Sequence, residues 1–281
     1  MRRARILAFL IFLASAAFYG YTEMMERNKP ADTAPEITCD EDILEITCEY
    51  TDEDLLEGIY AGDAEDGDLM DQVIVGQISP FIKKGESEVI YMVFDSSNQM
   101  DSLVRRVRFT DYESPTVSLT DPLIFHIGEG SYDSILRMIE VWDQLDGDLT
   151  EWMEVMDYDI SFASTGSYVF PVQVTNSYGD TVDLALPVHV QDTRLLDHSI
   201  YLNTSLVYAD VGEKLDPAEY IEKISGESGL DSGELLHRIS WENADTSVPG
   251  CSEIHYIYKN QAGEVSGETW LTVIVREQED A

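Results

Sequence analysis

The chain has 281 residues, of which 44% are hydrophobic and 10% aromatic, enough to build several small cores and too much for a disordered chain. Seventeen basic residues stand against 55 acidic ones, and the formal net charge of -38 argues against nucleic acid as a partner, because a polyanion would be repelled. The length suits two or three domains of roughly 80 to 100 residues.

The N-terminal segment, residues 1–30, has the pattern of an export signal. Three arginines precede an apolar run over residues 6–21, which is short for a membrane span of roughly 20 residues and long for a signal-peptide core. Aromatic Phe18, Tyr19 and Tyr21 favour an uncleaved single-pass anchor in the cell's own membrane, whereas the small residues before Ala16 would allow cleavage and secretion. Either interpretation predicts an extracytoplasmic protein.

Three cysteines follow, and two of them lie close together in "CDEDILEITC". In an exported chain Cys39 and Cys48 could form a disulfide if two short strands brought them together. The alternative is a free, buried thiol, which suits Cys251 best because it has no local partner.

The chain contains three copies of one unit. Residues 85–111 align with residues 166–192 at a constant shift of 81, and a third copy from Gly250 follows at a further shift of 84. Each copy has an alternating apolar run, a turn that begins at Asp95, Asn176 or Asn260, and a second alternating run. This pattern predicts a β-hairpin with one buried face in each copy.

The first half of each copy also repeats. "PEITC", "PTVSL" and "HSIYL" predict short strands, and apolar residues at helical spacing then predict a short helical turn within residues 51–61, 131–141 and 215–225. The domain boundaries are therefore predicted at 34–111, 112–192 and 193–277. Short linkers predict that neighbouring domains stack end to end as a semi-stiff rod.

Between the two halves, the first two copies carry Asp-x-x-Asp-Gly-Asp-Leu, and the third carries Ser-Gly-Glu-Leu at residues 232–235. One interpretation is calcium, since carboxylates around a glycine are hard oxygen ligands. An EF-hand loop is excluded, because its acidic end ligands are missing. The other interpretation is a tight turn in which Asp side chains bind backbone amides. The candidate metal ligands are Asp63, Asp66, Asp68, Asp143, Asp146 and Asp148.

Catalytic signatures are missing from the sequence. Five scattered histidines lack metal-ligand spacing, and no nucleophile elbow or phosphate-binding loop occurs, so we expect neither an enzyme nor a cofactor. Tyr91, Tyr168 and Tyr256 alternate into the expected core. Four tryptophans could pack in cores or interfaces, or line a carbohydrate surface: Trp142, Trp152, Trp241 and Trp270.

This order of elements and motifs resembles the tandem bacterial immunoglobulin-like (Ig-like) domains of Gram-positive secreted and surface proteins, including those appended to pesticidal crystal proteins. The resemblance is strongest around Asp146, Gly147, Asp148, Gly166 and Asn176 of the second copy. It implies an all-β protein of three tandem Ig-like β-sandwiches after the N-terminal helix, and a spacer or adhesion role.

The sequence therefore predicts a non-enzymatic surface protein that acts as a spacer or stalk, or binds an unknown protein or glycan at the cell surface. Two alternatives remain open. One is an accessory subunit of an envelope enzyme or assembly, and the other is an adhesin stiffened by calcium.

Overall fold

The computed structural model describes the backbone of residues 2–27, 33–225 and 237–277, and within these ranges every side chain except those of residues 2–11, 25–27 and 195. The fold is mostly β, as predicted. The chain forms two compact units, of which the first holds the sheets of the first repeat and the second holds the sheets of both later repeats.

Helix α1 (Arg2–Arg27) contains the predicted export segment. Within the described part of the chain, no helix combines the length and the hydropathy that crossing a membrane requires. Membrane anchoring through residues 6–21 stays a prediction.

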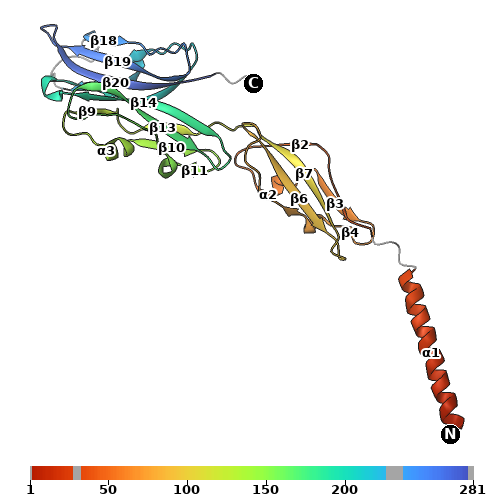
Figure 1. Ribbon diagram of the computed structural model, residues 1–281. Helices are drawn as coiled ribbons and strands as arrows, with labels where there is room; N and C mark the ends of the chain where they lie inside the picture. Colours follow the sequence, from red (N-terminus) through yellow and green to blue (C-terminus); the bar gives the residue numbers. More distant parts are fainter. Residues whose placement is uncertain (1, 28–32, 226–236, 278–281) are drawn as a thin grey trace. The chain divides into compact units, whose positions relative to one another are not determined.

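The first repeat is a β-sandwich of a three-stranded and a four-stranded sheet (Figure 1). The smaller sheet has the order β1-β3-β4, and the larger has the order β2-β7-β6-β5, with β2 parallel to β7. Alternating side chains of the long hairpin, such as Val89, Tyr91 and Val107, fill the space between the sheets. The elements are β1 (Glu36–Cys39), β2 (Ile43–Ile46), α2 (Asp52–Leu55), β3 (Ile59–Asp63), β4 (Gly67–Asp68), η1 (Met70–Gln72), β5 (Ile74–Val75), β6 (Glu86–Phe94) and β7 (Met100–Phe109).

The second repeat has the same topology. Its smaller sheet has the order β11-β10-β8 and its larger sheet the order β12-β13-β14-β9, again with one parallel pair, β9 and β14. The elements are β8 (Thr116–Leu119), β9 (Ile124–His126), α3 (Tyr132–Leu136), β10 (Ile139–Asp143), β11 (Gly147–Asp148), η2 (Thr150–Trp152), β12 (Glu154–Val155), β13 (Gly166–Thr175) and β14 (Thr181–Gln191).

The third repeat keeps the four-stranded sheet, in the order β16-β20-β19-β18, and pairs β15 with β17 in a second sheet. The helical turn predicted within residues 215–225 is η4, and the strand β17, which pairs with β15, follows it directly. The elements are η3 (Thr193–Leu195), β15 (Ser199–Leu202), β16 (Leu206–Asp210), η4 (Pro217–Tyr220), β17 (Ile221–Ser225), β18 (Ile239–Glu242), β19 (Gly250–Lys259) and β20 (Val265–Arg276).

The turns of the three long hairpins confirm the predicted motif. The Oδ1 atoms of Asp95, Asn176 and Asn260 each accept hydrogen bonds from two backbone amides of their own turn. A residue with positive φ follows three positions later in each turn, with values of 63° at Asn98, 85° at Gly179 and 80° at Gly263. A glycine or an asparagine is favoured there, because other side chains disfavour this conformation.

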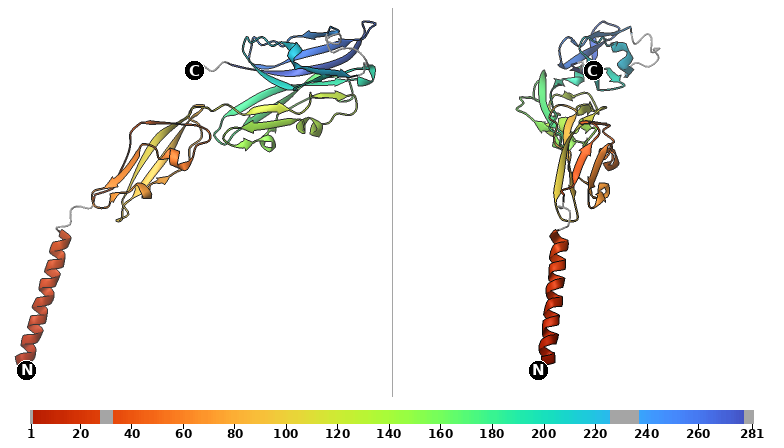
Figure 2. Two further views of the ribbon diagram at one scale, coloured as in Figure 1. Left: turned by 180° about the vertical axis from the view of Figure 1, so that it is seen from behind. Right: turned by 90° about the vertical axis from the view of Figure 1, so that its right-hand side faces the viewer.

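The third repeat has a hydrophobic core of its own, around Ile254, Tyr256 and Leu271, but its large sheet also packs against the core of the second repeat. The predicted end-to-end stacking is therefore wrong for this pair. Leu206 and Ile274, from the outer face of the third repeat's large sheet, belong to the core cluster of the second repeat. The Tyr208 hydroxyl donates to the Val117 carbonyl at 3.0 Å and accepts from the Val117 amide at 2.6 Å. Strands β14, β19 and β20 lie side by side, as Figures 1 and 2 show from three directions.

Candidate functional site

The repeated acidic motif forms the same turn in the first and second repeats. Gly67 and Gly147 both have φ of 78°, and each is paired across its turn with the first aspartate of the motif. Oδ1 of Asp63 accepts hydrogen bonds from the amides of Glu65 and Asp66 at 2.7 and 3.0 Å. Oδ1 of Asp143 does the same for the corresponding two amides, both at 2.9 Å.

The second aspartate of the motif ties this turn to the large sheet. Both carboxylate oxygens of Asp66 accept hydrogen bonds from Ser96. One comes from its amide at 2.7 Å and the other from its hydroxyl at 3.0 Å. Asp146 binds the amide and hydroxyl of Ser177 in the same way. Each motif therefore joins the two sheets of its own sandwich at the hairpin end.

The third aspartate accepts a hydrogen bond from the first residue of the helical turn that follows. Oδ1 of Asp148 accepts a hydrogen bond from the Thr150 amide at 2.9 Å, and Oδ1 of Asp68 accepts one from the Met70 amide at 3.0 Å. Hydrogen bonds from Thr150 hold the pKa of Asp148 below its usual value. Hydrogen bonds from the backbone amides of Asp66 and Glu65 lower the pKa of Asp63 in the same way.

No group of three or more His, Cys, Asp or Glu side chains placed to hold a metal ion occurs among the described residues. The third copy of the motif, residues 232–235, lies outside the described residues. The bonds above account for a turn, and the calcium hypothesis stays a prediction.

The predicted disulfide is not formed, since Cys39, Cys48 and Cys251 are all free and half-buried. Cys39 ends β1 in the small sheet, whereas Cys48 follows β2, which pairs with β7 in the large sheet. The two short strands belong to different layers, which the spacing in sequence does not reveal. Burial raises the pKa of the Cys251 thiol.

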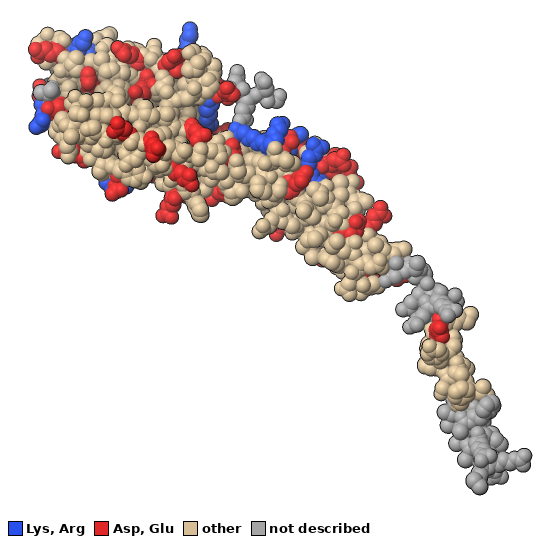
Figure 3. Space-filling model, viewed as in Figure 1, with Lys and Arg blue, Asp and Glu red and all other residues tan. Residues whose placement is uncertain are grey.

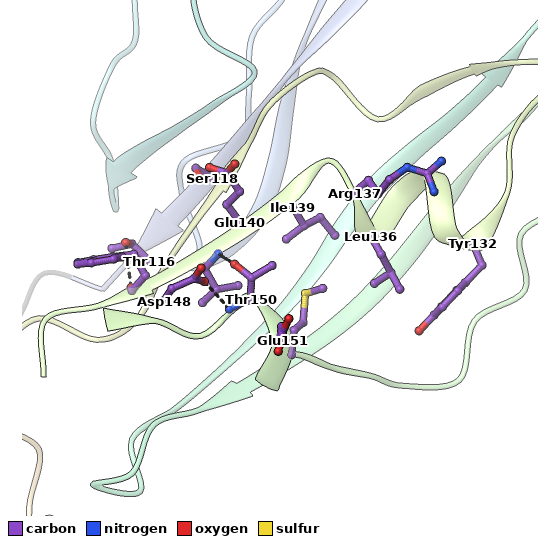
Figure 4. A pocket seen from close by; sticks show the side chains of 13 residues that line it. Thr116, Ser118, Tyr132, Leu136, Arg137, Ile139, Glu140, Asp148, Thr150 and Glu151 are labelled. Carbon is purple, nitrogen blue, oxygen red and sulfur yellow. Dashed lines mark hydrogen bonds between the residues drawn. The ribbon is translucent and has the colours of Figure 1, made fainter. Parts of the chain in front are cut away.

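A groove of about 870 Å³ lies on the second repeat, beside β10 and between α3 and η2 (Figure 4). Trp142 lines it and is 59% exposed, on a strand whose alternate residues Ile139, Val141 and Asp143 are buried. The polar side chains that line the groove include Thr116, Ser118, Arg137, Glu140 and Glu151. The groove thus combines an aromatic face with hydrogen-bond donors and acceptors.

The corresponding surface of the first repeat lacks this indole, and its exposed aromatic side chain is Tyr60, two residues before the matching position. In the first repeat, Gly62 of β3 pairs with Glu36 of β1, and in the second repeat Trp142 of β10 pairs with Thr116 of β8. Gly62 therefore occupies the position of Trp142. The fold does not require the indole, because the first repeat forms the same sheet without it. The alternation of β10 in the sequence places Trp142 outside, and this signal could have identified it.

The other tryptophans have different surroundings. Trp152 is 72% exposed but does not line the groove, and Trp241 is also exposed. Trp270 lies at the boundary of the second and third repeats, stacked between His189 and His255 with ring centroids 4.0 and 4.4 Å away. His189 Nε2 and Glu253 Oε1 share a hydrogen bond of 2.6 Å. Trp270 therefore serves the interface, as one interpretation predicted.

No family model matches the chain. The pesticidal crystal protein Cry22Aa of Bacillus thuringiensis is 24% identical over 139 residues, which cover 47% of this chain and 18% of that protein. This weak similarity agrees with the resemblance inferred from the motifs, and it does not assign a family.

Two of the solved structures that are similar to the chain come from Clostridium species. One contains CBM51-2 in complex with GlcNAc and INT domains of Clostridium perfringens ZmpB, with 18% identity, 54% of this chain and 26% of that chain covered, and a TM-score of 0.23. The other contains fibronectin(III)-like modules of Clostridium thermocellum CbhA, with 15% identity, 74% and 98% covered, and a TM-score of 0.22. Scores this low carry no argument about fold or function.

Proposed function

We propose that the protein is a non-enzymatic, extracytoplasmic spacer and binding protein of three tandem Ig-like domains, held at the membrane by its N-terminal segment. The observation that carries the binding role is the exposed Trp142 beside the groove of the second repeat. The fold accepts a glycine at this position, so the exposed indole is not needed for folding. We infer that it contacts a partner.

The spacer role is supported by the way the repeats are built. The second and third repeats pack into one compact unit, and hydrogen bonds that Asp66 and Asp146 accept join the two sheets of the first and second sandwiches. A binding groove on such a body is held at a fixed place on it. The expected partner is a protein or glycan at the cell surface.

The binding role is tested with the full chain and two tryptophan variants. Immobilised wild type, Trp142→Ala and Trp152→Ala are incubated with cell-envelope extract and with an array of neutral glycans, and the retained material is identified. We expect Trp152→Ala to retain what the wild type retains, and Trp142→Ala to lose it. Equal retention by all three chains would contradict a binding role for the groove.

The predicted location needs a separate measurement. Intact cells that express the full chain with a C-terminal epitope are treated with protease, and the epitope is followed in the membrane and soluble fractions. Removal of the epitope from a membrane-associated chain is expected. An epitope protected until the cells are lysed would show that the extracytoplasmic location is wrong.

A further inference from the structure

The large sheet of the first repeat has an apolar face on its solvent side. Three cross-strand pairs form it, namely Ile90 with Val104, Phe94 with Met100, and Ile74 with Met92. Five of these six side chains are exposed and Met92 is half-buried. We call these six residues the β6–β7 face. Contiguous exposed apolar side chains of this kind mark an interaction surface.

The fold of the repeat does not require this face to be apolar. At the matching positions of the second repeat, the three pairs are Pro171 with Ala185, Thr175 with Thr181, and Glu154 with Gln173. Both repeats nevertheless build the same sheet order and the same hairpin. The apolar side chains of the first repeat therefore serve something other than the sandwich itself.

The third repeat shows what covers such a face within this chain. The outer side of its large sheet carries Leu206 and Ile274, which are buried in the core cluster of the second repeat. The equivalent sheet thus packs its outer face against a β-sandwich. A second copy of the chain supplies a β-sandwich for the first repeat.

Charges at one end of the β6–β7 face favour a particular arrangement of two copies. Beyond the apolar pairs, Glu88 on β6 lies opposite Arg106 on β7, and both are exposed. In Figure 3 the visible side of the first repeat has a broad uncharged area, with basic side chains gathered at one end. The Glu88 and Arg106 pair places one acidic and one basic side chain next to each other on this face of the sheet.

We propose that the protein forms a twofold symmetric dimer through the β6–β7 face. A twofold axis parallel to the strands, between β6 and β7, lays β6 of one copy over β7 of the other. Ile90 then packs on the second copy's Val104, and Glu88 meets the second copy's Arg106. The twofold rotation generates each of these contacts a second time with the two copies exchanged. Apolar side chains therefore pack against apolar side chains, and two pairs of opposite charges face each other.

The test is the oligomeric state of the full chain, measured by sedimentation equilibrium in a mild detergent at fixed detergent concentration. The wild type is expected to dimerise with a dissociation constant of about 10 µM or lower. Val104→Lys places a charge in the centre of the face and should weaken dimerisation at least about tenfold. The matched control is Val169→Lys in the second repeat, because Val169 is 54% exposed and Val104 is 55% exposed; it should dimerise like the wild type.

Charge reversal tests the geometry. Arg106→Glu and Glu88→Arg should each weaken the dimer, and the double variant should restore it, because the opposite charges then meet again across the axis. Circular dichroism confirms that each variant is folded. A monomeric wild type, a Val104→Lys variant that dimerises normally, or a double variant no better than either single one would overturn the proposed dimer.

Discussion

Replacing Gly147 by alanine tests whether the repeated acidic motif is a turn that depends on backbone conformation. Gly147 has φ of 78°, and an added Cβ would lie no closer than 3.7 Å to Cη2 of Trp142. The methyl group therefore causes no clash, and its cost is that of the left-handed backbone, about 1 to 2 kcal/mol. Alanine also makes the unfolded chain stiffer, which favours folding and offsets about 0.4 to 1 kcal/mol of this cost. The net expectation is a loss of about 1 kcal/mol.

The assay is the thermal midpoint of the full chain by calorimetry. Because Leu206 and Ile274 of the third repeat lie in the core of the second, the two repeats should unfold together. In a unit of 150 to 250 residues, a loss of about 1 kcal/mol lowers the midpoint by about 2 to 4 °C. Gly147→Asn should lose less, since Asn98 already adopts φ of 63° in another turn of this chain. An unchanged midpoint for Gly147→Ala, or an equal loss for both variants, would refute the conformational argument.

Three further predictions concern stability. Residues 112–192 alone should melt several degrees below residues 112–277, because the shorter fragment lacks Leu206 and Ile274, which complete the core of the second repeat. Equal midpoints would show that these two side chains add no stability. Calcium should raise the midpoint of the full chain no more than magnesium does, since the motif carboxylates already bind amide and hydroxyl groups; a calcium-specific rise that Asp146→Asn removes would establish an ion site. The lowered pKa of Asp148 means that its bonds stabilise the fold above the unfolded pKa of about 4 and are lost as the pH falls through the lower folded pKa. Asp148→Asn should therefore lose less stability than the wild type between pH 6 and pH 3, and parallel losses would exclude this contribution.

Local patterns in the sequence were sufficient to predict the hairpins and their turns. Alternation along β6, β13 and β19 gives the buried face directly, because side chains of a strand point to opposite sides. The parallel strands β2, β9 and β16 were not predicted, although each joins a large sheet. Their three to five residues are too few to show a period, and their partners lie more than 60 residues away in the sequence.

The site was less accessible from the sequence, since it depends on contacts between distant segments. The turn interpretation of the acidic motif follows from Gly147 and its neighbours, but the bond from Asp146 to Ser177 spans 31 residues. The stacking of Trp270 between His189 and His255 depends on the packing of two repeats, which short linkers alone do not determine. The groove beside Trp142 requires the register of β8, β10 and β11.

The three repeats preserve their interiors and differ on their outer faces. Val89, Phe170 and Ile254 are fully buried in their respective hairpins, because each sandwich needs an apolar layer between its sheets. Outward positions are free of that requirement, and they diverge: an apolar face in the first repeat, a Trp142 groove in the second, and in the third a face buried on its neighbour. The fold does not restrict these outward positions, so contacts with partners can determine which residues occupy them. Substitutions on the outer faces should therefore change binding without changing stability. Val104→Lys should weaken dimerisation and Trp142→Ala should weaken binding at the groove, while the melting temperature of the sandwiches stays almost unchanged. A large loss of stability in either variant would show that the side chain contributes to folding.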